Sequence, residues 1–285
     1  MKKLSVYSFA VAAVLLLSAC GQNKKTVIPA TLDEVKAEMD AIVNAFNEQV
    51  DAIQTDVNLS DEDKGNKIET LYEDVIKNYI ATGRKHLEAA PDSETAAYVI
   101  GELNNVAEDA EMEELLGLLG DKAKAMEPVA SILKVREVRK ATAEGQMFTD
   151  FEIVQDPENP ETSTVKFSDY IGKGKYILVD FWASWCGPCK REIPNIKSVW
   201  DKYHGEDFDV LSVAVWDKVE DTKAAALEHG ISWLQIINAQ KIPTDAYGIE
   251  GIPQIILFGP DGTILKRDLR GEAIEAEVAK YIEAK

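Results

Sequence analysis

A short apolar run that leads directly into a closely spaced pair of cysteines is the feature that most constrains the fold of this chain. The run is Tyr176-Ile-Leu-Val-Asp-Phe181, and the pair stands in Trp185-Cys186-Gly-Pro-Cys189. Continuous apolar runs of this length are typical of a strand buried in the centre of a sheet. A helical pattern begins at the cysteines, so both sulfurs are expected on the first turn of a helix, close enough to form a small disulfide ring.

The start of a helix gives the two sulfurs different chemical roles. Free backbone amides and the helix dipole favour a thiolate there, which lowers the pKa of the outer cysteine and makes it nucleophilic near neutral pH. We therefore expect an exposed Cys186 to attack a substrate disulfide and the more buried Cys189 to resolve the mixed disulfide.

Two other uses of a Cys-x-x-Cys motif do not fit this sequence. A zinc site needs two further ligands, and none of His86, His204 and His229 is spaced to supply them. Attachment of a c-type haem requires a histidine directly after the second cysteine, where this chain has Lys190. The sequence therefore predicts no metal, and no cofactor beyond the redox-active cysteine pair itself.

The beginning of the chain is typical of an export signal. Two lysines precede an apolar stretch, Phe9 to Leu17, which is short for a membrane span. Leu17-Ser-Ala-Cys20 resembles the bacterial lipoprotein box, which implies that residues 1–20 are a signal peptide, that Cys20 carries lipids and that 21–30 form a linker. A plain secretory signal or an uncleaved anchor would also explain the pattern.

Bulk composition narrows the function classes. The chain has 285 residues, of which 46% are hydrophobic and 28% charged, and this suits two globular domains rather than disorder. Its formal charge of -19 argues against a nucleic-acid partner, since phosphate binding depends on clustered Lys and Arg. With Cys20 acylated, Cys186 and Cys189 remain as the thiols of an exported protein, and one local pair cannot form a structural disulfide framework.

Residues 31–144 are expected to form an all-α helical domain of about five helices and of unknown role. Thr31-Leu-Asp-Glu34 is typical of a capping box and opens a helical pattern that continues to Val57. Ser60 is expected to cap a second helix, which Pro91 ends. Further helical patterns cover Ala96–Leu103, Met112–Leu119 and Val129–Val138.

Residues 145–285 alternate between strand and helix patterns. Gly259-Pro-Asp-Gly262 is a hairpin turn signal. The order predicts a β-α-β half with parallel strands, followed by a hairpin and a final helix. Strands are predicted at 151–154, 164–167, 176–181, 210–215, 233–237, 254–258 and 263–269, and helices after Cys186 and at 222–229 and 272–282.

The motifs of this half resemble those of the thioredoxin superfamily, and most closely its TlpA/ResA-like membrane-associated branch. The stretch Val179-Asp-Phe-Trp-Ala-Ser-Trp-Cys-Gly-Pro-Cys-Lys190 resembles the family signature. Gly251-Ile-Pro-Gln254 resembles the family's cis-proline loop, and Gly259 to Gly262 its following hairpin. The resemblance implies an α/β thioredoxin-like fold from residue 145 onward and a thiol–disulfide oxidoreductase, and it leaves the helical half unexplained.

The same resemblance implies roles for further residues. Asp180 falls where thioredoxins bury an acid beneath the second cysteine, and Glu192 where the branch carries an active-site glutamate. A carboxylate with a raised pKa at this place would shuttle the proton of Cys189, although an exposed helix carboxylate is the alternative for Glu192. Pro253 is implied to be cis and to expose the Ile252 backbone to an extended substrate peptide. The implied substrate-binding residues are Trp185, Gly187, Pro188, Ile252 and Pro253.

The Gly187-Pro188 dipeptide is that of thioredoxin, whose potential of about -270 mV is reducing. We therefore expect the protein to reduce disulfides of extracytoplasmic proteins with electrons from an integral-membrane donor. We expect it in the bacterial cell envelope, lipid-anchored and facing the periplasm. Three alternatives stay open: a disulfide isomerase, which would need a dimer; a thiol peroxidase; and a client-binding module whose redox centre is vestigial.

Overall fold

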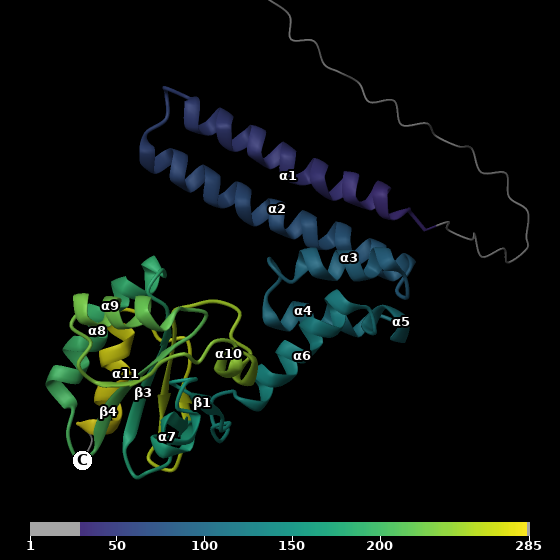
Figure 1. Cartoon of the computed structure of the whole chain (residues 1–285). Coiled ribbons are helices and arrows are strands. Elements are labelled where there is room, and N and C mark those ends of the chain that lie inside the picture. The colour runs from purple at the N-terminus through teal and green to yellow at the C-terminus, as the bar shows by residue number, and fades with distance from the viewer. Residues whose placement is uncertain (1–28, 284–285) are drawn as a thin grey trace, which may run out of the picture. The chain divides into compact units, whose positions relative to one another are not determined.

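The computed structural model describes residues 29–283, which form two compact units that meet in the sequence at Pro91 and Asp92 (Figure 1). The predicted signal peptide, Cys20 and most of the predicted linker lie outside the described residues. Within residues 29–283, no helix combines the length and the apolar composition that a membrane span requires.

Two long helices, α1 (Leu32–Thr55) and α2 (Asp61–Ala89), make up the described part of the first unit. Both predicted caps are confirmed, because Thr31 and Glu34 form a reciprocal capping box and the Ser60 side chain caps α2. The two helices pack against each other as an antiparallel pair (Figure 1). Local signals in the sequence therefore predict this unit well.

Four shorter helices open the second unit. The sequence changes at residue 145 from helical patterns to alternating strand and helix patterns, which predicts a domain boundary there. In the structure, however, these four helices belong to the same compact unit as the strands that follow. The last of them contacts α10 (Ile242–Tyr247), a tertiary contact that the sequence pattern does not reveal. The assignment of 31–144 as one domain stays a prediction. The four helices are α3 (Glu94–Leu103), α4 (Asp109–Gly117), α5 (Asp121–Lys124) and α6 (Glu127–Ala141).

A five-stranded mixed sheet lies at the centre of the second unit, in the order β5-β4-β3-β6-β7. β3, β4 and β5 run parallel, whereas β6 and β7 pair antiparallel with their neighbours. The predicted α/β thioredoxin-like fold is therefore confirmed, with its parallel half and its hairpin. The strands are β3 (Tyr176–Trp182), β4 (Phe208–Ala214), β5 (Leu234–Ile236), β6 (Gln254–Phe258) and β7 (Ile264–Lys266).

The side chains of β3 alternate between two hydrophobic cores, because successive residues of a strand point to opposite faces of the sheet. Leu178 and Trp182 pack in the core on one face of the sheet. Val179 and Phe181 pack in the core on the other face, with Tyr247 of α10. The helices of the first face are α8 (Gly187–Tyr203), α9 (Val219–Glu228) and α11 (Glu272–Ile282).

A small antiparallel pair of strands, β1 and β2, precedes the main sheet, as predicted. Within residues 145–283, the sequence pattern does not predict three one- or two-turn helices, since segments this short show no helical periodicity. The strands are β1 (Glu152–Val154) and β2 (Thr164–Lys166), and the short helices are α7 (Pro160–Ser163), η1 (Phe167–Asp169) and α10.

Arg267, which follows β7, holds the end of α6 to the rest of the second unit. Its guanidinium is buried and donates to the carbonyl oxygen of Thr142 at 2.6 Å and to that of Tyr247 at 2.9 Å. These bonds satisfy two carbonyls at the ends of α6 and α10, and a buried bond to a charged donor is worth about 1.5–3 kcal/mol.

Replacing Gly248 with alanine is expected to destabilise the second unit by about 3 kcal/mol. Gly248 has a φ of +60°, and a Cβ there would lie 2.6 Å from Arg139 Cγ and 2.9 Å from the Val135 carbonyl oxygen. Gly230→Ala is the matched control, because Gly230 has a φ of +67° but no atom within 4 Å of the added carbon, and it should cost only about 1 kcal/mol. Urea unfolding measures both losses, and equal values would contradict the close approach of α6 to α10.

Candidate active site

Cys186 and Cys189 are joined by a disulfide at the start of α8. β3 ends at Trp182, and a short loop leads to Cys186, which is the N-cap residue of the helix. The Cys189 amide donates a hydrogen bond to the Cys186 sulfur, with an N···S distance of 3.1 Å. Because the first turn of a helix presents unpaired amides, this geometry favours negative charge on Cys186 once the disulfide is reduced.

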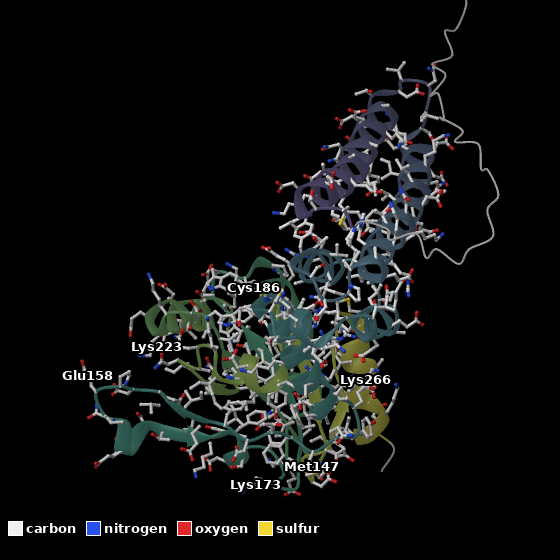
Figure 2. All side chains as sticks on the ribbon, turned by 90° about the vertical axis from the view of Figure 1, so that its right-hand side faces the viewer. Met147, Glu158, Lys173, Cys186, Lys223 and Lys266 are labelled. Atoms are coloured by element: carbon white, nitrogen blue, oxygen red, sulfur yellow. A yellow bond between two sulfur atoms is a disulfide. The ribbon has the colours of Figure 1, made fainter. Side chains whose placement is uncertain are left out.

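The expectation that Cys186 is exposed is wrong for the disulfide state. Cys186 is only 3% exposed, and Cys189 is 1% exposed. The loop before β6 explains this burial, since the carbonyl oxygen of Ile252 lies 3.6 Å from the Cys186 sulfur. Trp185, which is 60% exposed, and Pro188 are therefore the accessible side chains beside the sulfur pair. Cys186 lies at one end of the second unit, far from Lys173 at the other end (Figure 2).

The Ile252–Pro253 peptide bond is cis, as the resemblance implies. Pro253 is buried, Ile252 is half-buried, and both lie in the loop that faces the disulfide. Arg270, just before α11, donates a hydrogen bond to the Pro253 carbonyl oxygen. The same guanidinium also donates to the carbonyl oxygen of Leu269 at 2.6 Å. Arg270 therefore ties the cis-proline loop to the start of the last helix.

The structure brings the predicted site residues together from three parts of the second unit. The loop after β3 and the first turn of α8 supply Trp185, Gly187 and Pro188 beside the two cysteines, and the loop before β6 supplies Ile252 and Pro253. Their proximity fits a single site, while their contacts with a substrate stay a prediction.

Asp180 is buried in the middle of β3, on the sheet face that α8 covers. It is 1% exposed, and neither carboxylate oxygen has a hydrogen-bond partner among the described residues. Burial raises the pKa of Asp180 from 3.8 to about 7, against the opposing effect of Arg270, while the nearby charge of Glu192 raises it further. Asp180 can therefore take up or release a proton near neutral pH.

Glu192 lies one turn after Cys189 on α8 and is half-buried. Its Oε2 accepts hydrogen bonds from the Asn195 side chain and from the Gly271 amide, both at 2.9 Å. Gly271 is the N-cap residue of α11, so this carboxylate also satisfies a free amide at the start of that helix. Glu192 is thus a tethered carboxylate near Asp180, and not the freely exposed one that the alternative supposed.

Arg270 was not singled out by the sequence. It influences Asp180 electrostatically and contacts the cis-proline loop. Its only local signal is a cation directly before Gly271 at the start of a helical pattern, which is equally typical of a surface arginine. Its importance arises from tertiary neighbours that lie far away in the chain.

A groove of about 630 Å³ lies beside Trp185, the residue before Cys186, and is also lined by Trp216 and Asn238, among others. The Trp185 indole nitrogen donates to the Trp216 carbonyl oxygen at 3.0 Å, which fixes the exposed ring at the groove. The Trp185 ring therefore borders the groove, while its implied contact with a substrate stays a prediction.

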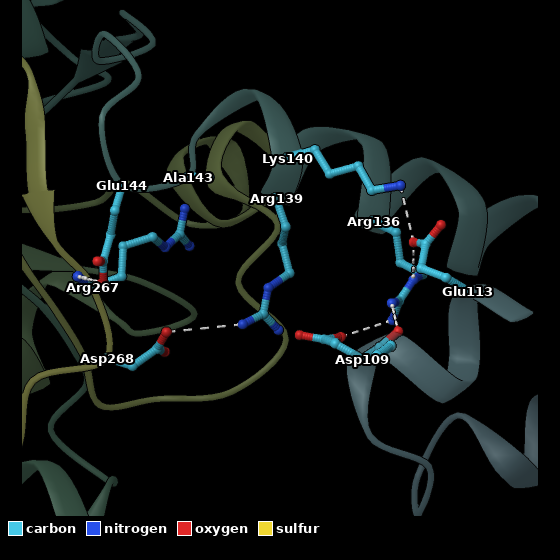
Figure 3. A pocket seen from close by; sticks show the side chains of 10 residues that line it. Asp109, Glu113, Arg136, Arg139, Lys140, Ala143, Glu144, Arg267 and Asp268 are labelled. Atoms are coloured by element: carbon cyan, nitrogen blue, oxygen red, sulfur yellow. Dashed lines mark hydrogen bonds and ion pairs between the residues drawn. The ribbon is translucent and has the colours of Figure 1, made fainter.

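A second cavity, of about 470 Å³, lies between α4, α6 and the segment after β7 (Figure 3). Its charged side chains neutralise one another: Arg136 pairs with Asp109 at 3.0 Å and with Glu113 at 3.2 Å, and Lys140 pairs with Glu113 at 2.9 Å. Since these charges are already paired, the cavity gives no sign of a ligand. Among residues 29–283, no group of three His, Cys, Asp or Glu side chains is placed to hold a metal ion.

Comparison with known proteins gives matches to thiol-redox proteins. The profile of the AhpC/TSA family matches residues 145–267. Thiol-disulfide oxidoreductase ResA of Geobacillus thermodenitrificans is 27% identical over 146 residues, which cover 51% of this chain and 80% of that protein. ResA of Bacillus subtilis is 23% identical over 125 residues, covering 44% and 68%.

Solved structures give similar matches. The thioredoxin domain of a thiol-disulfide oxidoreductase from Bacteroides vulgatus is 29% identical, with a TM-score of 0.44, and covers 49% of this chain and 98% of that one. A putative thiol:disulfide interchange protein DsbE from Chlorobium tepidum is 26% identical, with a TM-score of 0.42, and covers 48% and 96%.

Proposed function

This chain is a ResA/TlpA-like thiol–disulfide oxidoreductase of the thioredoxin superfamily, and from that premise we propose that it reduces disulfides of protein clients outside the cytoplasm. The observation that carries the proposal is the Cys186–Cys189 disulfide at the start of α8, with the Cys189 amide directed at the Cys186 sulfur. The Gly187-Pro188 dipeptide between the cysteines favours the reducing direction, since it is that of thioredoxin.

The proposed reaction is a pair of thiol–disulfide exchanges. The Cys186 thiolate attacks one sulfur of a client disulfide, a Cys186–client bond forms, and the second client sulfur leaves as a thiolate. Cys189 then loses its proton and attacks the Cys186 sulfur, which releases the first client sulfur. The client gains two electrons and two protons overall, and Cys186 and Cys189 become the disulfide.

Asp180 and Glu192 are proposed to serve the second exchange. Cys189 must lose a proton before it can attack, and a carboxylate with a pKa of about 7 can accept that proton at neutral pH. Asp180 lies on the sheet face beneath α8, and Glu192 follows Cys189 by one turn. The pair therefore offers a route for the proton away from the buried sulfur.

The backbone beside the cis-proline is proposed to hold the client. Gly251 is exposed and Ile252 is half-buried, so their backbone groups can pair with an extended peptide, as strand addition requires. Trp185 borders the same site with an exposed ring. No cofactor besides the cysteine pair is proposed.

The localisation and the electron supply are proposed from the sequence. The lipoprotein-like Leu17-Ser-Ala-Cys20 supports a lipid anchor at Cys20 in the bacterial cell envelope, with the protein facing the periplasm. A reductase in an oxidising compartment must be reduced again after each turnover, and we propose an integral-membrane dithiol protein as the donor. The membrane fraction of cells fed radiolabelled palmitate should contain the labelled wild type, whereas label on Cys20→Ser would contradict the anchor.

The direction of electron flow is tested by the reduction potential. Equilibration of the Cys186–Cys189 pair with glutathione or dithiothreitol buffers should give a value near that of thioredoxin, about -270 mV, and a value above about -150 mV would contradict a reductase. The rival functions have separate readouts. Refolding of scrambled ribonuclease by a dimer would favour an isomerase, and turnover of hydrogen peroxide would favour a thiol peroxidase.

Helices α1 and α2 are proposed to act as a spacer or as a docking element for clients. The second unit begins at Asp92, so removal of residues 29–91 leaves α3 to α6 with the sheet. The shortened protein should retain insulin reductase activity. Unchanged activity toward every native client would contradict a docking role.

A further inference from the structure

The loop between β4 and α9 contains a buried carboxylate that reaches across to the loop before the cysteines. Asp217 is only 8% exposed. Its Oδ2 accepts the Ser184 amide at 2.7 Å, and its Oδ1 accepts the Ser184 hydroxyl at 2.9 Å. Ser184 lies two residues before Cys186. The Asp217 carboxylate therefore fixes the position of the loop that leads to the proposed nucleophile, Cys186.

The same carboxylate is anchored on its other side to α9. Oδ1 accepts the Lys218 amide and Oδ2 accepts the Thr222 hydroxyl, both at 2.9 Å. Asp217 therefore bonds the start of α9 and the loop before Cys186 at once. Bonds between a carboxylate and buried donors are among the stronger ones in proteins.

Two further hydrogen bonds join the end of β3 and the loop after it to the loop after β4. The Val215 amide donates to the Trp182 carbonyl at 2.9 Å, and the Trp185 indole donates to the Trp216 carbonyl at 3.0 Å. Trp216 adopts a φ of +53°, a left-handed conformation that is strained for a residue other than glycine. This unusual conformation lies directly beside the carbonyl that accepts the Trp185 indole.

We propose that Asp217 is a positioning residue of the redox site, which holds Ser184 and Trp185 so that Cys186 sits over the first amides of α8 and the indole lines the substrate groove. The inference rests on the proposed function and deepens it. No part of Asp217 takes part in the exchange itself. Its effect passes through its bonds to the Ser184 amide and hydroxyl to the sulfur of Cys186.

The bonding pattern explains why an aspartate, and not an asparagine, is required here. Each carboxylate oxygen accepts one backbone amide and one hydroxyl. The hydroxyls of Ser184 and Thr222 can reorient, but a backbone amide can only donate. In Asp217→Asn, the side-chain NH2 must face the amide of either Ser184 or Lys218, and one buried donor then loses its acceptor.

The test compares Asp217→Asn with Glu220→Gln in the reduced full-length protein. Glu220 lies in the first turn of α9 with a side chain that is 85% exposed, so its variant removes a charge without touching the Ser184 loop. We expect Asp217→Asn to lower the alkylation rate of Cys186 by iodoacetamide at pH 7, and kcat/KM for insulin, by about tenfold. The midpoint of the alkylation pH profile should move upward, and Glu220→Gln should leave all three values unchanged.

Two further variants separate positioning from general stability. Ser184→Ala and Thr222→Val each remove one hydroxyl donor from the same carboxylate, the first on the cysteine side and the second on the α9 side. Both should lower the unfolding midpoint, but only Ser184→Ala should shift the Cys186 pH profile and raise KM. This pair decides the question even if Asp217→Asn does not fold.

Equal shifts in both hydroxyl variants, or a shift in neither, would overturn the positioning role. An Asp217→Asn protein that folds and matches the wild type in Cys186 alkylation would overturn it as well. Failure of the proposed function looks different: the wild type itself would not reduce insulin, while the alkylation profiles of its variants would still report on Asp217.

Discussion

Replacement of Cys186 by serine is expected to lower insulin reduction at least about a thousandfold, to the rate given by dithiothreitol alone. Loss of a nucleophile removes the covalent intermediate and with it nearly all of the rate enhancement. The hydroxyl oxygen of serine can still accept the hydrogen bond that the Cys189 amide donates to Cys186, so the change should leave the fold intact. Turbidity of reduced insulin measures the loss.

Cys189→Ser is the matched variant, because it removes the second sulfur and keeps the first. It should also stop turnover, but it should accumulate mixed disulfides with Cys186, visible as dithiothreitol-sensitive bands on non-reducing gels. Mass spectrometry of those bands would identify the clients. Mixed disulfides of equal yield in Cys186→Ser would contradict the assignment of Cys186 as the attacking sulfur.

Asp180→Asn is expected to raise stability at alkaline pH by as much as about 4 kcal/mol. The pKa of Asp180 is about 7 in the folded protein, raised from 3.8 mainly by burial. Between these values the folded state binds more protons than the unfolded state, so the stability of the wild type falls as the pH rises from about 4 to about 7. Each pKa unit corresponds to about 1.4 kcal/mol of unfolding free energy. The asparagine side chain does not ionise, so Asp180→Asn does not lose this stability as the pH rises.

Urea unfolding of the oxidised proteins at pH 4 and pH 8 measures this effect. The gap between Asp180→Asn and the wild type should be small at pH 4 and large at pH 8. Asp245→Asn, at an exposed position of α10, is the control and should show no such pH dependence. A gap that is the same at both pH values would show that Asp180 is not held protonated by its surroundings. The variant should also slow the second exchange, since it removes the buried carboxylate that is proposed to accept the Cys189 proton.

Much of this fold can be predicted from local sequence signals, because the features concerned depend on residues that are close together in the chain. The run from Tyr176 to Phe181 marks the central strand through its apolar character, and the capping residues Thr31 and Ser60 mark the starts of α1 and α2. The spacing of Cys186 and Cys189 likewise predicts the disulfide. Each of these features depends on neighbours within about one turn or one strand.

Features that depend on tertiary neighbours could not be predicted in this way. Asp217 lies 33 residues from Ser184 in the chain, and nothing in its local sequence separates it from an ordinary helix cap. Arg270 meets the cis-proline loop only because β6 and the start of α11 are brought together by the fold. The burial of Cys186 has the same origin, since the covering group is the Ile252 carbonyl.

The membership of α3 to α6 in the second unit is a further example. Their amphipathic patterns indicate helices, but a pattern does not say which partner covers the apolar face. One link between α6 and the rest of the unit is the close approach of Gly248, where an added Cβ would lie 2.6 Å from Arg139 Cγ and 2.9 Å from the Val135 carbonyl oxygen. A glycine that follows a short unpredicted helix gives no such signal in the sequence.

The central claim is that Cys186, at the first amides of α8, is the reactive sulfur of a reversible dithiol. The most direct test is the rate of iodoacetamide modification of the reduced protein across pH, with the modified cysteine identified by mass spectrometry. We predict that Cys186 reacts first and remains reactive well below pH 8.5, the usual pKa of a free thiol. Reaction of Cys189 first, or a Cys186 profile no different from that of free cysteine, would contradict the account.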